Sequence, residues 1–190
     1  MEITDRTPAL ADLAGPEHCE ARVKIYGKLL SVNLGKAVSH YTGDTAITTA
    51  IRKWPLAGQV ALSDLGIVGD EHVRSVHGGP GKALYAYARE DLDWWERELG
   101  YPLRNGAFGE NLTTEGIDVT SSQAGDVWVV GQSAVLQVTE PRVPCRTFEA
   151  HMRTEENWRE RFREAGRPGW YLRVRWPARI AAGDQIVVDR

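Results

Sequence analysis

Residues 124–142 read AGDVWVVGQSAVLQVTEPR, and this stretch gives the strongest indication of the fold. Two runs rich in β-branched and aromatic residues flank residues 131–133, a composition that favours two short strands joined by a turn. The sequence AGD opens the stretch and occurs again at residues 182–184, each time ahead of a strand-like run. We interpret AGD as a recurrent turn, not as the unit of a repeat architecture.

Most of the remaining chain has the same character. VKIYGKLLSVNLG, residues 23–35, favours one or two short strands that end in a turn at residues 33–36. Residues 40–72 mix β-branched runs with glycine and proline, which is typical of strands and loops. Residues 169–190 predict strand, turn and strand, and apolar residues alternating with arginines indicate one covered and one wetter face. Many short strands and few helices predict a mainly β fold with a closed or nearly closed sheet.

Two segments favour helices. Residues 82–101, KALYAYAREDLDWWERELGY, place apolar side chains near one face at helical spacing, with only Asp91 interrupting the stripe. Gly100 stands where a helix commonly stops. A second helix is predicted over residues 154–165, with its first residue as N-cap and Gly166 after its end.

Length and composition restrict the class of protein. A chain of 190 residues is expected to form one domain, with a core at about residues 24–190 and a lead-in at 1–23. Its apolar content of 42% and net charge of −3 are ordinary for a soluble globular protein. No apolar run approaches the roughly 20 residues that span a bilayer, and the N-terminus lacks the apolar region of a secretory signal. Two cysteines suit a reducing compartment, so we expect a cytoplasmic protein without a membrane partner.

Arginines gather in the last third of the chain. Residues 142–179 contain ten arginines, no lysine and five glutamates. The three arginines within residues 159–163 are best interpreted as a solvated helix face. Arg142 and Arg146 are candidates for binding an anionic ligand, because a guanidinium suits phosphates and carboxylates. A nucleic-acid partner is not favoured, since no stacked-aromatic or recognition-helix pattern accompanies the charge.

The stretch PRVPC places Cys145 after a proline and between two arginines. The prolines stiffen the backbone, and the positive charge of Arg142 and Arg146 favours the thiolate. A thiolate is a nucleophile or a soft metal ligand, whereas the alternative interpretation is an inert buried cysteine. Neither an HExxH helix nor a Gly-x-Ser-x-Gly elbow occurs in the sequence, so zinc and serine hydrolases are not expected.

A glycine-rich loop precedes the first predicted helix. His77 is followed by Gly78 and Gly79, and Lys82 stands at the expected helix start. Glycines allow backbone N–H groups to converge on an anion, although the spacing of a P-loop is absent. The local pattern by itself favours a turn before a helix over an anion cradle.

A second glycine-rich stretch, GAFGENLTTEGIDV, covers residues 106–119. Phe108 and Leu112 are expected to anchor it to the core, with Glu110 and Asn111 held beside these anchors. Physical reasoning favours a structural loop in which Asn111 bonds to the backbone.

Together these stretches closely resemble the MOSC family, the domain named for the C-terminal part of molybdenum-cofactor sulfurase, and within it the stand-alone bacterial YiiM-type branch. The matching pieces occur in the family's order over roughly residues 30–150, and they are GDEH…HGGPGKALYAY, GAFGENLTTEGI, Gly125–Asp126 and PRVPC. The resemblance implies a MOSC-type β-barrel with a few peripheral helices.

The resemblance also implies a ligand and roles for residues. The ligand is the molybdenum cofactor, molybdopterin, and pyridoxal phosphate is not expected in this chain. Cys145, which matches the family's cysteine, either ligates molybdenum or carries sulfur. Arg142, Lys82 and the backbone of residues 77–79 are candidates for holding the anionic tail of the cofactor. Asn111 is a candidate for contacting the pterin or an oxygen on the metal.

YiiM-type proteins are linked to the detoxifying reduction of N-hydroxylated compounds such as N-hydroxylaminopurines. The implied reaction converts the N–OH group to an amine, and a partner reductase supplies the electrons. One alternative is a sulfur-carrier module that holds a persulfide on Cys145, and a third is a MOSC fold that only binds an anionic metabolite. Whether the chain forms a homodimer is left open.

The sequence differs from the pattern of the family in two places. Residues 71–76 read EHVRSV, where family members often have Gln and Asp, so substrate contacts of that loop are not carried over. Longer YiiM relatives have a small helical extension after the barrel, whereas this sequence ends on an expected strand, GDQIVVDR.

Overall fold

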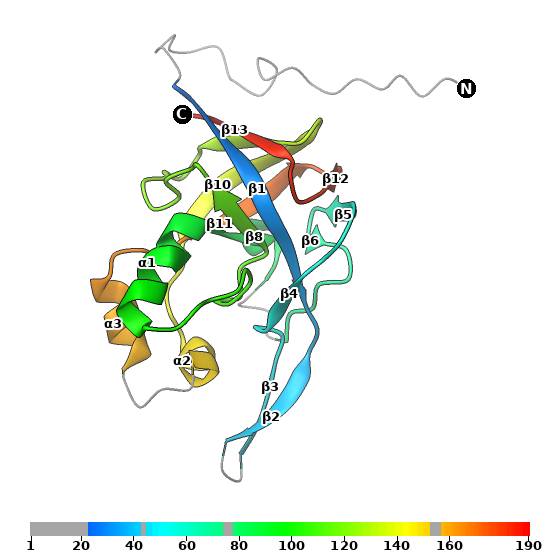
Figure 1. The fold of residues 1–190 in the computed structure, drawn as a ribbon. Coiled ribbons are helices and arrows are strands. Elements are labelled where there is room, and N and C mark those ends of the chain that lie inside the picture. The colour runs from blue at the N-terminus through cyan, green and yellow to red at the C-terminus, as the bar shows by residue number, and fades with distance from the viewer. Residues whose placement is uncertain (1–22, 43–44, 74–77, 153–156) are drawn as a thin grey trace.

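The computed structural model describes residues 23–42, 45–73, 78–152 and 157–190 (Figure 1). Within these ranges seven strands form a closed barrel. The barrel is closed because the two strands at the ends of this row of seven also pair with each other. Neighbouring strands are antiparallel except β7 and β8, which are parallel. The order around the barrel is β13 (Gln185–Asp189), β9 (Val127–Val130), β10 (Ala134–Pro141), β11 (Trp170–Trp176), β7 (Leu84–Ala88), β8 (Leu112–Glu115) and β1 (Lys24–Gly35).

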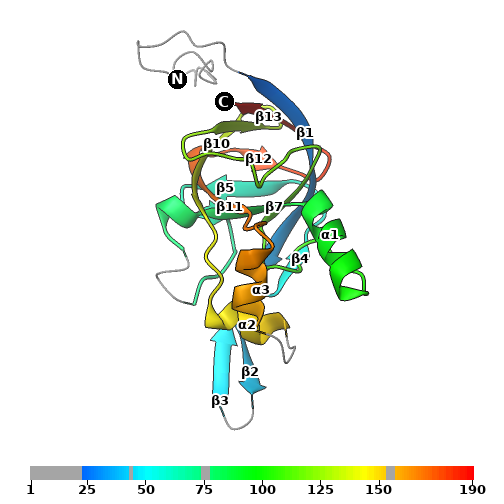
Figure 2. The ribbon, with the colours of Figure 1, turned by 90° about the vertical axis from the view of Figure 1, so that its left-hand side faces the viewer.

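Shorter strands surround the barrel. β2 (Val38–Thr42) and β3 (Thr45–Thr49) form a hairpin that projects from the body of the molecule (Figures 1 and 2). β4 (Lys53–Pro55) pairs with the far end of β1. The remaining three form a small sheet, and they are β5 (Val60–Ser63), β6 (Gly66–Ile67) and β12 (Arg179–Ile180).

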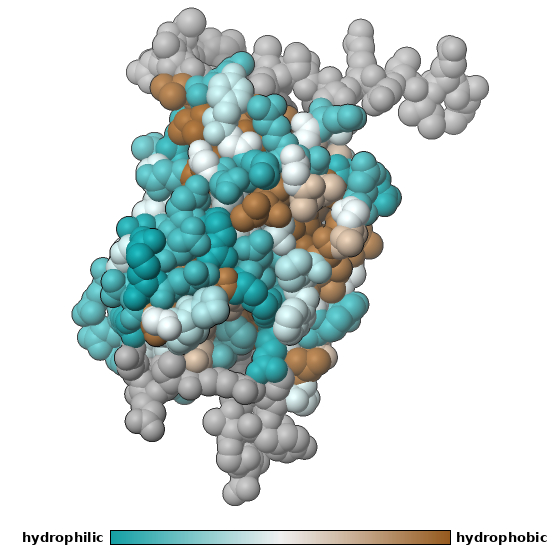
Figure 3. Space-filling model, in the orientation of Figure 1, coloured by the Kyte–Doolittle hydropathy of each residue, from teal (hydrophilic) through white to brown (hydrophobic). Residues whose placement is uncertain are grey.

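The described helices lie on the outside of the barrel (Figures 1 and 2). They are α1 (Arg89–Leu99), α2 (Arg146–Met152), α3 (Trp158–Glu164) and the short 3-10 helix η3 (Pro80–Lys82). None of the helices in the described ranges is both long enough and apolar enough to cross a bilayer. The surface over α1 is largely hydrophilic, whereas apolar residues gather over β5 and β6, where Leu65 and Val68 are exposed (Figure 3).

The molecule has two cores that share β7. Leu84 and Ala86 point into the barrel, and Tyr85 and Tyr87 point outward into an aromatic cluster beneath the helices, as the two-residue period of a strand requires. Apolar side chains fill the barrel, among them Leu29, Leu84, Leu112, Trp128, Leu136, Leu172 and Ile186. The aromatic cluster contains Tyr85, Tyr87, Leu92, Trp95, Phe108, Phe148, Trp158 and Phe162.

The helix predicted over residues 82–101 was wrong in its first half. Leu84–Ala88 is a strand, and the helix starts only at Arg89. All five residues of this strand are buried, so the run is apolar on both faces and its periodicity does not separate helix from strand. The predicted end is confirmed, because Gly100 has φ of 74° and its N–H donates to the Glu96 carbonyl oxygen at 2.9 Å.

The second predicted helix corresponds to α3, which ends just before Ala165 and Gly166. Its N-cap is Asn157, whose side chain accepts a hydrogen bond from the Glu160 N–H, whereas Thr154 lies outside the described residues. Helix α2 was not predicted. Its seven residues are too few for a helical period to show.

The mainly β fold with a closed barrel and peripheral helices is confirmed, as is the turn at residues 131–133 between β9 and β10. The two AGD turns share one hydrogen-bond pattern. The Asp126 N–H donates to the Gln123 carbonyl at 3.1 Å and its carboxylate accepts from the Gln123 N–H at 3.0 Å. Asp184 does the same with Ala181, at 3.2 and 2.8 Å.

Two strand predictions need adjustment. β1 is one strand that runs to Gly35, so the turn predicted at residues 33–36 begins later, because residues 33–35 pair with β4. On β11 the covered and wet faces alternate as predicted over residues 172–175. Trp176, at the end of β11, is exposed although it belongs to the predicted covered face.

Candidate functional site

A cavity of about 150 Å³ lies beside the barrel, where β7 and β11 meet the segment between β10 and α2. Its walls come from parts of the chain that are far apart in sequence. The lining residues that carry titratable or hydrogen-bonding side chains include Lys53, His72, Lys82, Asn111, Arg142 and Cys145. Tyr85 and Tyr171 add an aromatic wall, with ring centroids 5.3 Å apart and planes tilted by 42°.

The structure brings together four of the seven residues that the sequence indicated as site residues. Lys82, Asn111, Arg142 and Cys145 all line the cavity. Gly78 and Gly79 are described but are not part of the lining, and His77 lies outside the described residues. The anion cradle predicted at this loop therefore stays a prediction.

Cys145 lies between the end of β10 and the start of α2, and its thiol is free and half-buried. One side of the residue packs against the aromatic cluster, and the other side faces the cavity. Its carbonyl oxygen accepts from the Glu149 N–H at 3.1 Å, which ties its backbone to the first turn of α2. The thiol is thus reachable from the cavity and fixed in position.

Arg142 is a buried cation without an acidic partner among the described residues. Only 8% of the residue is exposed. Its guanidinium lies over the rings of Tyr85 and Phe148, at 4.7 and 4.5 Å from the ring centroids, and Nη1 donates to the Phe108 carbonyl oxygen. A charge that is removed from water and unpaired is unfavourable, so an anion in the cavity would compensate it.

The stretch GAFGENL holds the Phe108 carbonyl that binds Arg142. Glu110 is fully buried and accepts from the N–H groups of Gly106 and Phe108 and from the Thr113 hydroxyl. Burial raises the pKa of Glu110, and these hydrogen bonds oppose that rise. Glu110 is not part of the cavity lining, so its role is to shape the loop, in agreement with the structural interpretation from the sequence.

Asn111 lines the cavity but most of its hydrogen-bonding capacity is used by the protein. Its side-chain oxygen accepts from the Tyr85 N–H at 3.2 Å. Its amide nitrogen donates to the Asn33 carbonyl at 3.2 Å and to Asp70 Oδ2 at 2.9 Å. Both amide hydrogens are therefore taken, and only an oxygen lone pair remains for a ligand.

Lys82 is held loosely at the cavity. Its Nζ lies 3.6 Å from Glu140 Oε2 and 5.4 Å from the centroid of the Tyr171 ring, and its side chain is 30% exposed. The Thr139 hydroxyl donates to the Gly81 carbonyl at 2.7 Å and so fixes the turn that carries Lys82. Because the ion pair with Glu140 is long and half-exposed, Lys82 can turn toward an anionic ligand.

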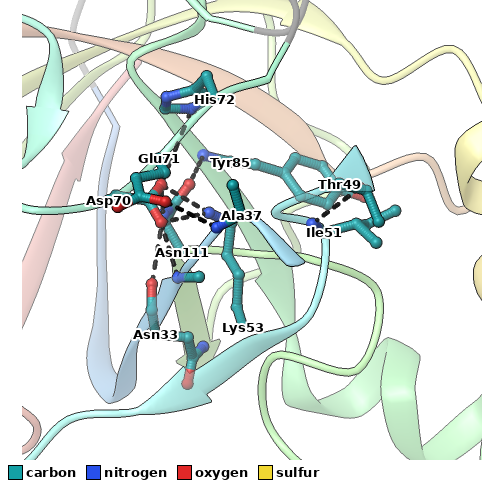
Figure 4. A network of polar contacts seen from close by, with 11 residues as sticks. Asn33, Ala37, Thr49, Ile51, Lys53, Asp70, Glu71, His72, Tyr85 and Asn111 are labelled. Atoms are coloured by element: carbon teal, nitrogen blue, oxygen red, sulfur yellow. Dashed lines mark hydrogen bonds and ion pairs between the residues drawn. The ribbon is translucent and has the colours of Figure 1, made fainter. Parts of the chain in front are cut away.

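Sequence reasoning missed a buried ion pair between Lys53, which lines the cavity, and Asp70, which is not part of the lining (Figure 4). Lys53 Nζ lies 2.7 and 2.6 Å from the two carboxylate oxygens of Asp70, and the side chains are 7% and 1% exposed. The Gly35 N–H and the Asn111 amide also donate to Asp70. Burial lowers the pKa of Lys53, and the charge of Asp70 opposes this effect. Asp70 lies in the GDEH stretch that resembles the family, but its pairing with Lys53 has no local sequence signal because only the fold brings the two residues together.

Comparison with known proteins identifies the family. The model of the MOSC domain matches residues 73–187 of this chain, which include β7, β10 and most of the cavity lining. The chain belongs to the MOSC family. Its alignment with Uncharacterized protein YflK of Bacillus subtilis (strain 168) has 36% identity over 159 residues, covering 83% of this chain and 71% of YflK.

Two further MOSC-related proteins are similar over a smaller share of their own length. Identity is 34% over 165 residues with a protein called Reductase from Gibberella moniliformis, covering 84% of this chain and 29% of that protein. Identity is 35% over 138 residues with Protein YiiM of Escherichia coli (strain K12), covering 70% and 61%. The chain therefore spans less than two thirds of either protein.

The MOSC fold is also seen in solved structures. The crystal structure of YiiM from Geobacillus stearothermophilus superposes with a TM-score of 0.67 at 30% identity, covering 85% of this chain and 74% of that one. The predicted membership of the MOSC family and the likeness to YiiM are thus confirmed.

Proposed function

We propose that this MOSC protein binds the molybdenum cofactor in the cavity and reduces N-hydroxylated compounds there. The observation that carries the proposal is the pairing of Arg142 with Cys145 on one cavity. A buried guanidinium without an acidic partner in the described part of the chain favours binding of an anion, and a free thiol favours binding of a soft metal. Molybdopterin offers both, a phosphate and a molybdenum ion.

The residues present suit this group. Cys145 would ligate the metal, and Arg142 with Lys82 would hold the anionic tail. Asn111 could contribute its side-chain oxygen only, because both of its amide hydrogens are bonded to the protein. When bound, the cofactor supplies two-electron chemistry that amino-acid side chains lack.

The walls of the cavity favour a flat substrate. Tyr85 and Tyr171 present tilted rings on one side. The Tyr85 hydroxyl donates to the Pro168 carbonyl at 2.7 Å, which fixes its ring. A heteroaromatic ring such as a purine could pack against Tyr171, the more exposed ring of the two. The proposed substrate class is therefore an N-hydroxylated heteroaromatic compound, as the likeness to YiiM-type proteins implies.

The name of one relative agrees with a reduction, since Reductase of Gibberella moniliformis is 34% identical. The electrons are proposed to come from a partner reductase, as the resemblance to YiiM-type proteins implies. A sulfur-carrier function is the second candidate, because the free and half-buried thiol of Cys145 could also hold a persulfide.

Analysis of metal and pterin content tests the proposal. Protein made in a host that synthesises the cofactor should contain close to one molybdenum per chain, and Cys145→Ser should lose it. Cys19→Ser removes the other cysteine of the chain and is the control for loss of a thiol as such, so it should keep its molybdenum if Cys145 is the ligand. Conversion of 6-N-hydroxylaminopurine to adenine with a chemical reductant should follow the metal content.

Other outcomes of this experiment decide between the candidates. A persulfide on Cys145 in protein that contains no molybdenum would favour the sulfur carrier. Full retention of molybdenum in Cys145→Ser would remove Cys145 as the ligand and contradict the proposal.

A further inference from the structure

The part of the cavity wall that contains His72 has no role in the cofactor binding proposed above. His72 is the histidine that lines the cavity among the residues that the structure describes. Its side chain is 27% exposed, and Nε2 lies 3.8 Å from Asp70 Oδ2, within ion-pair range but too far for a hydrogen bond (Figure 4). The imidazole therefore has contact with both solvent and the polar network around Lys53.

Asp70 cannot move to follow the imidazole, because its carboxylate is held on both oxygens. Oδ1 accepts from the Gly35 N–H at 2.8 Å, and Oδ2 accepts from Asn111 at 2.9 Å, while Lys53 bonds to both. The ring of His72 also packs closely against Gly78, where a Cβ atom would lie 3.1 Å from the ring. The position of the ring is thus limited by a fixed negative charge on one side and by backbone on the other.

Burial and the charge of Asp70 act in opposite directions on proton binding by His72. Burial lowers the pKa of His72 below its usual 6.5, Asp70 raises it and Lys53 lowers it. Glu71 is adjacent in the chain, but its carboxylate bonds to Lys36 Nζ and to the Ala37 N–H, at 3.0 and 2.7 Å. Proton uptake by His72 therefore depends chiefly on burial, Asp70 and Lys53.

Reduction of an N-hydroxylated compound consumes protons. The balanced reaction is R–NH–OH + 2 e⁻ + 2 H⁺ → R–NH₂ + H₂O, in which the N–O bond breaks and one O–H and one N–H bond form. The electron pair comes from the reduced molybdenum cofactor of the proposed function. The leaving hydroxyl must be protonated to depart as water, so a proton donor in the cavity would accelerate the reaction.

Other lining groups are poorly suited to donate that proton. Lys53 is locked in a buried ion pair with Asp70, and burial raises the pKa of Tyr85 far above its usual value. Arg142 does not release its proton at any ordinary pH. His72 combines access to solvent with an imidazole, the side chain that exchanges protons near neutral pH.

We propose that His72 delivers the proton to the departing hydroxyl of the N–OH group, and that Asp70 is a positioning residue for its ring. The inference rests on the proposed function, since it assigns a role within that reaction. Solvent at the mouth of the cavity returns the proton to His72 after each turnover.

The test compares His72→Gln with His151→Gln in the cofactor-loaded protein. Glutamine keeps a hydrogen-bonding side chain but cannot exchange a proton at these pH values. His72→Gln should keep its molybdenum and its KM while kcat falls by about 100-fold or more, the usual range for loss of general acid catalysis. His151 is also partly buried but does not line the cavity, so His151→Gln should keep kcat at neutral pH.

The pH dependence of the rate distinguishes a proton donor from a residue that only supports the structure. The wild-type rate should fall as pH rises above the pKa of His72, because the protonated fraction of the imidazole declines. His72→Gln should lose this dependence. An unchanged kcat and pH profile in His72→Gln, with wild-type activity present, would overturn the inference and leave the proposed function intact.

A second measurement does not depend on turnover. Imidazole ¹⁵N resonances of the protein loaded with oxidised cofactor are followed by NMR, with His72 assigned by its loss in His72→Gln. Adding 6-N-hydroxylaminopurine should shift the His72 resonances, whereas adenine should shift them less. No difference between the two ligands would contradict contact with the N–OH group. Absence of molybdenum and of reduction in the wild type would instead refute the proposed function, and the inference with it.

Discussion

Arg142 shows how the surroundings of a single residue decide its role. In the sequence, Arg142 and Arg146 are equivalent flanks of Cys145. In the structure Arg142 is buried between two aromatic rings at the cavity, whereas Arg146 is exposed at the start of α2. The difference arises because Arg142 directly follows β10 and packs against the Tyr85 and Phe148 rings, whereas Arg146 begins a helix at the surface. Of these two arginines, Arg142 therefore brings to the cavity a charge that has no acidic partner among the described residues.

Replacing Arg142 by lysine tests whether its positive charge alone, or also its planar guanidinium group, is needed. Arg142→Lys keeps the positive charge but loses the planar stack on Tyr85 and Phe148 and the hydrogen bond to Phe108. We expect the free energy of unfolding to fall by about 1–3 kcal/mol and the cofactor content to drop. Urea unfolding of the cofactor-free protein and molybdenum analysis of the loaded protein measure the two effects.

Arg175→Lys is the matched control for this change. Arg175 is exposed on β11 and bonds only to the side chain of Gln137 among the described residues, so its replacement should change stability by no more than about 0.5 kcal/mol. If Arg142→Lys behaved like Arg175→Lys in both measurements, the stacked guanidinium would have no special role.

At the scale of the elements, helix α2 links the cavity to the outer aromatic core. Cys145 precedes its first residue, and Phe148 packs into the aromatic cluster at 4.9 Å from the ring of Phe162 on α3. His151, in the last turn, is held by its Nε2 at 2.8 Å from the Ala107 carbonyl oxygen. The helix is thus held near its start by the packing of Phe148 and at its end by the contact between His151 and the Ala107 carbonyl.

His151 should make the protein sensitive to acid. Burial lowers the pKa of His151 to about 4, with nearby Arg142, Arg52 and Arg104 adding to the effect. Between pH 4 and 6.5 the unfolded chain binds a proton at this residue that the folded chain does not, so stability falls as the pH falls through this window. The loss attributable to His151 is expected to reach about 3 kcal/mol at pH 4.

The comparison with His151→Gln isolates this contribution from that of other groups. Above pH 7 the difference in unfolding free energy between variant and wild type should be constant. As the pH falls from 6.5 to 4, the unfolding free energy of the wild type should decrease more than that of His151→Gln. Parallel curves for the two proteins over the whole range would show that His151 is not buried in its neutral form.

At the scale of the whole molecule, stability depends on closing the barrel between β1 and β13. These strands pair antiparallel over residues 24–28 and 185–189. Val188 on β13 points into the barrel and is 0% exposed, whereas Val187 is on the outer face and only half-buried. Neighbouring valines on one strand thus face the two environments that a barrel separates.

Threonine at these two positions tests the closure. Valine and threonine have similar shapes and both favour strands, so the variants differ in where a hydroxyl is placed. Val188→Thr buries the hydroxyl and should lower the free energy of unfolding by about 1–3 kcal/mol. Val187→Thr should change it by no more than about 0.5 kcal/mol. Equal effects of the two substitutions in urea unfolding would contradict the inward orientation of Val188.

Much of the candidate site could be anticipated because its residues lie in recognisable local motifs. The stretches containing Lys82, Asn111, Arg142 and Cys145 resemble a known family, and the fold places all four on one cavity. Their detailed roles could not be read in the same way. For example, nothing near Asn111 in the sequence reveals that both of its amide hydrogens bond to distant residues.

The sequence by itself determined the local features of this protein. Glycine and aspartate set the two AGD turns, Gly100 ends its helix, and β-branched runs form β9 and β10, because short-range sterics and hydrogen bonds suffice for each. The tertiary structure alone decided that residues 84–88 form a strand, and that Lys53, Asp70 and His72 meet at the cavity. The strand depends on burial on both of its faces, and the meeting of these three residues depends on contacts between distant segments. The local periodicity of apolar residues in the sequence reveals neither.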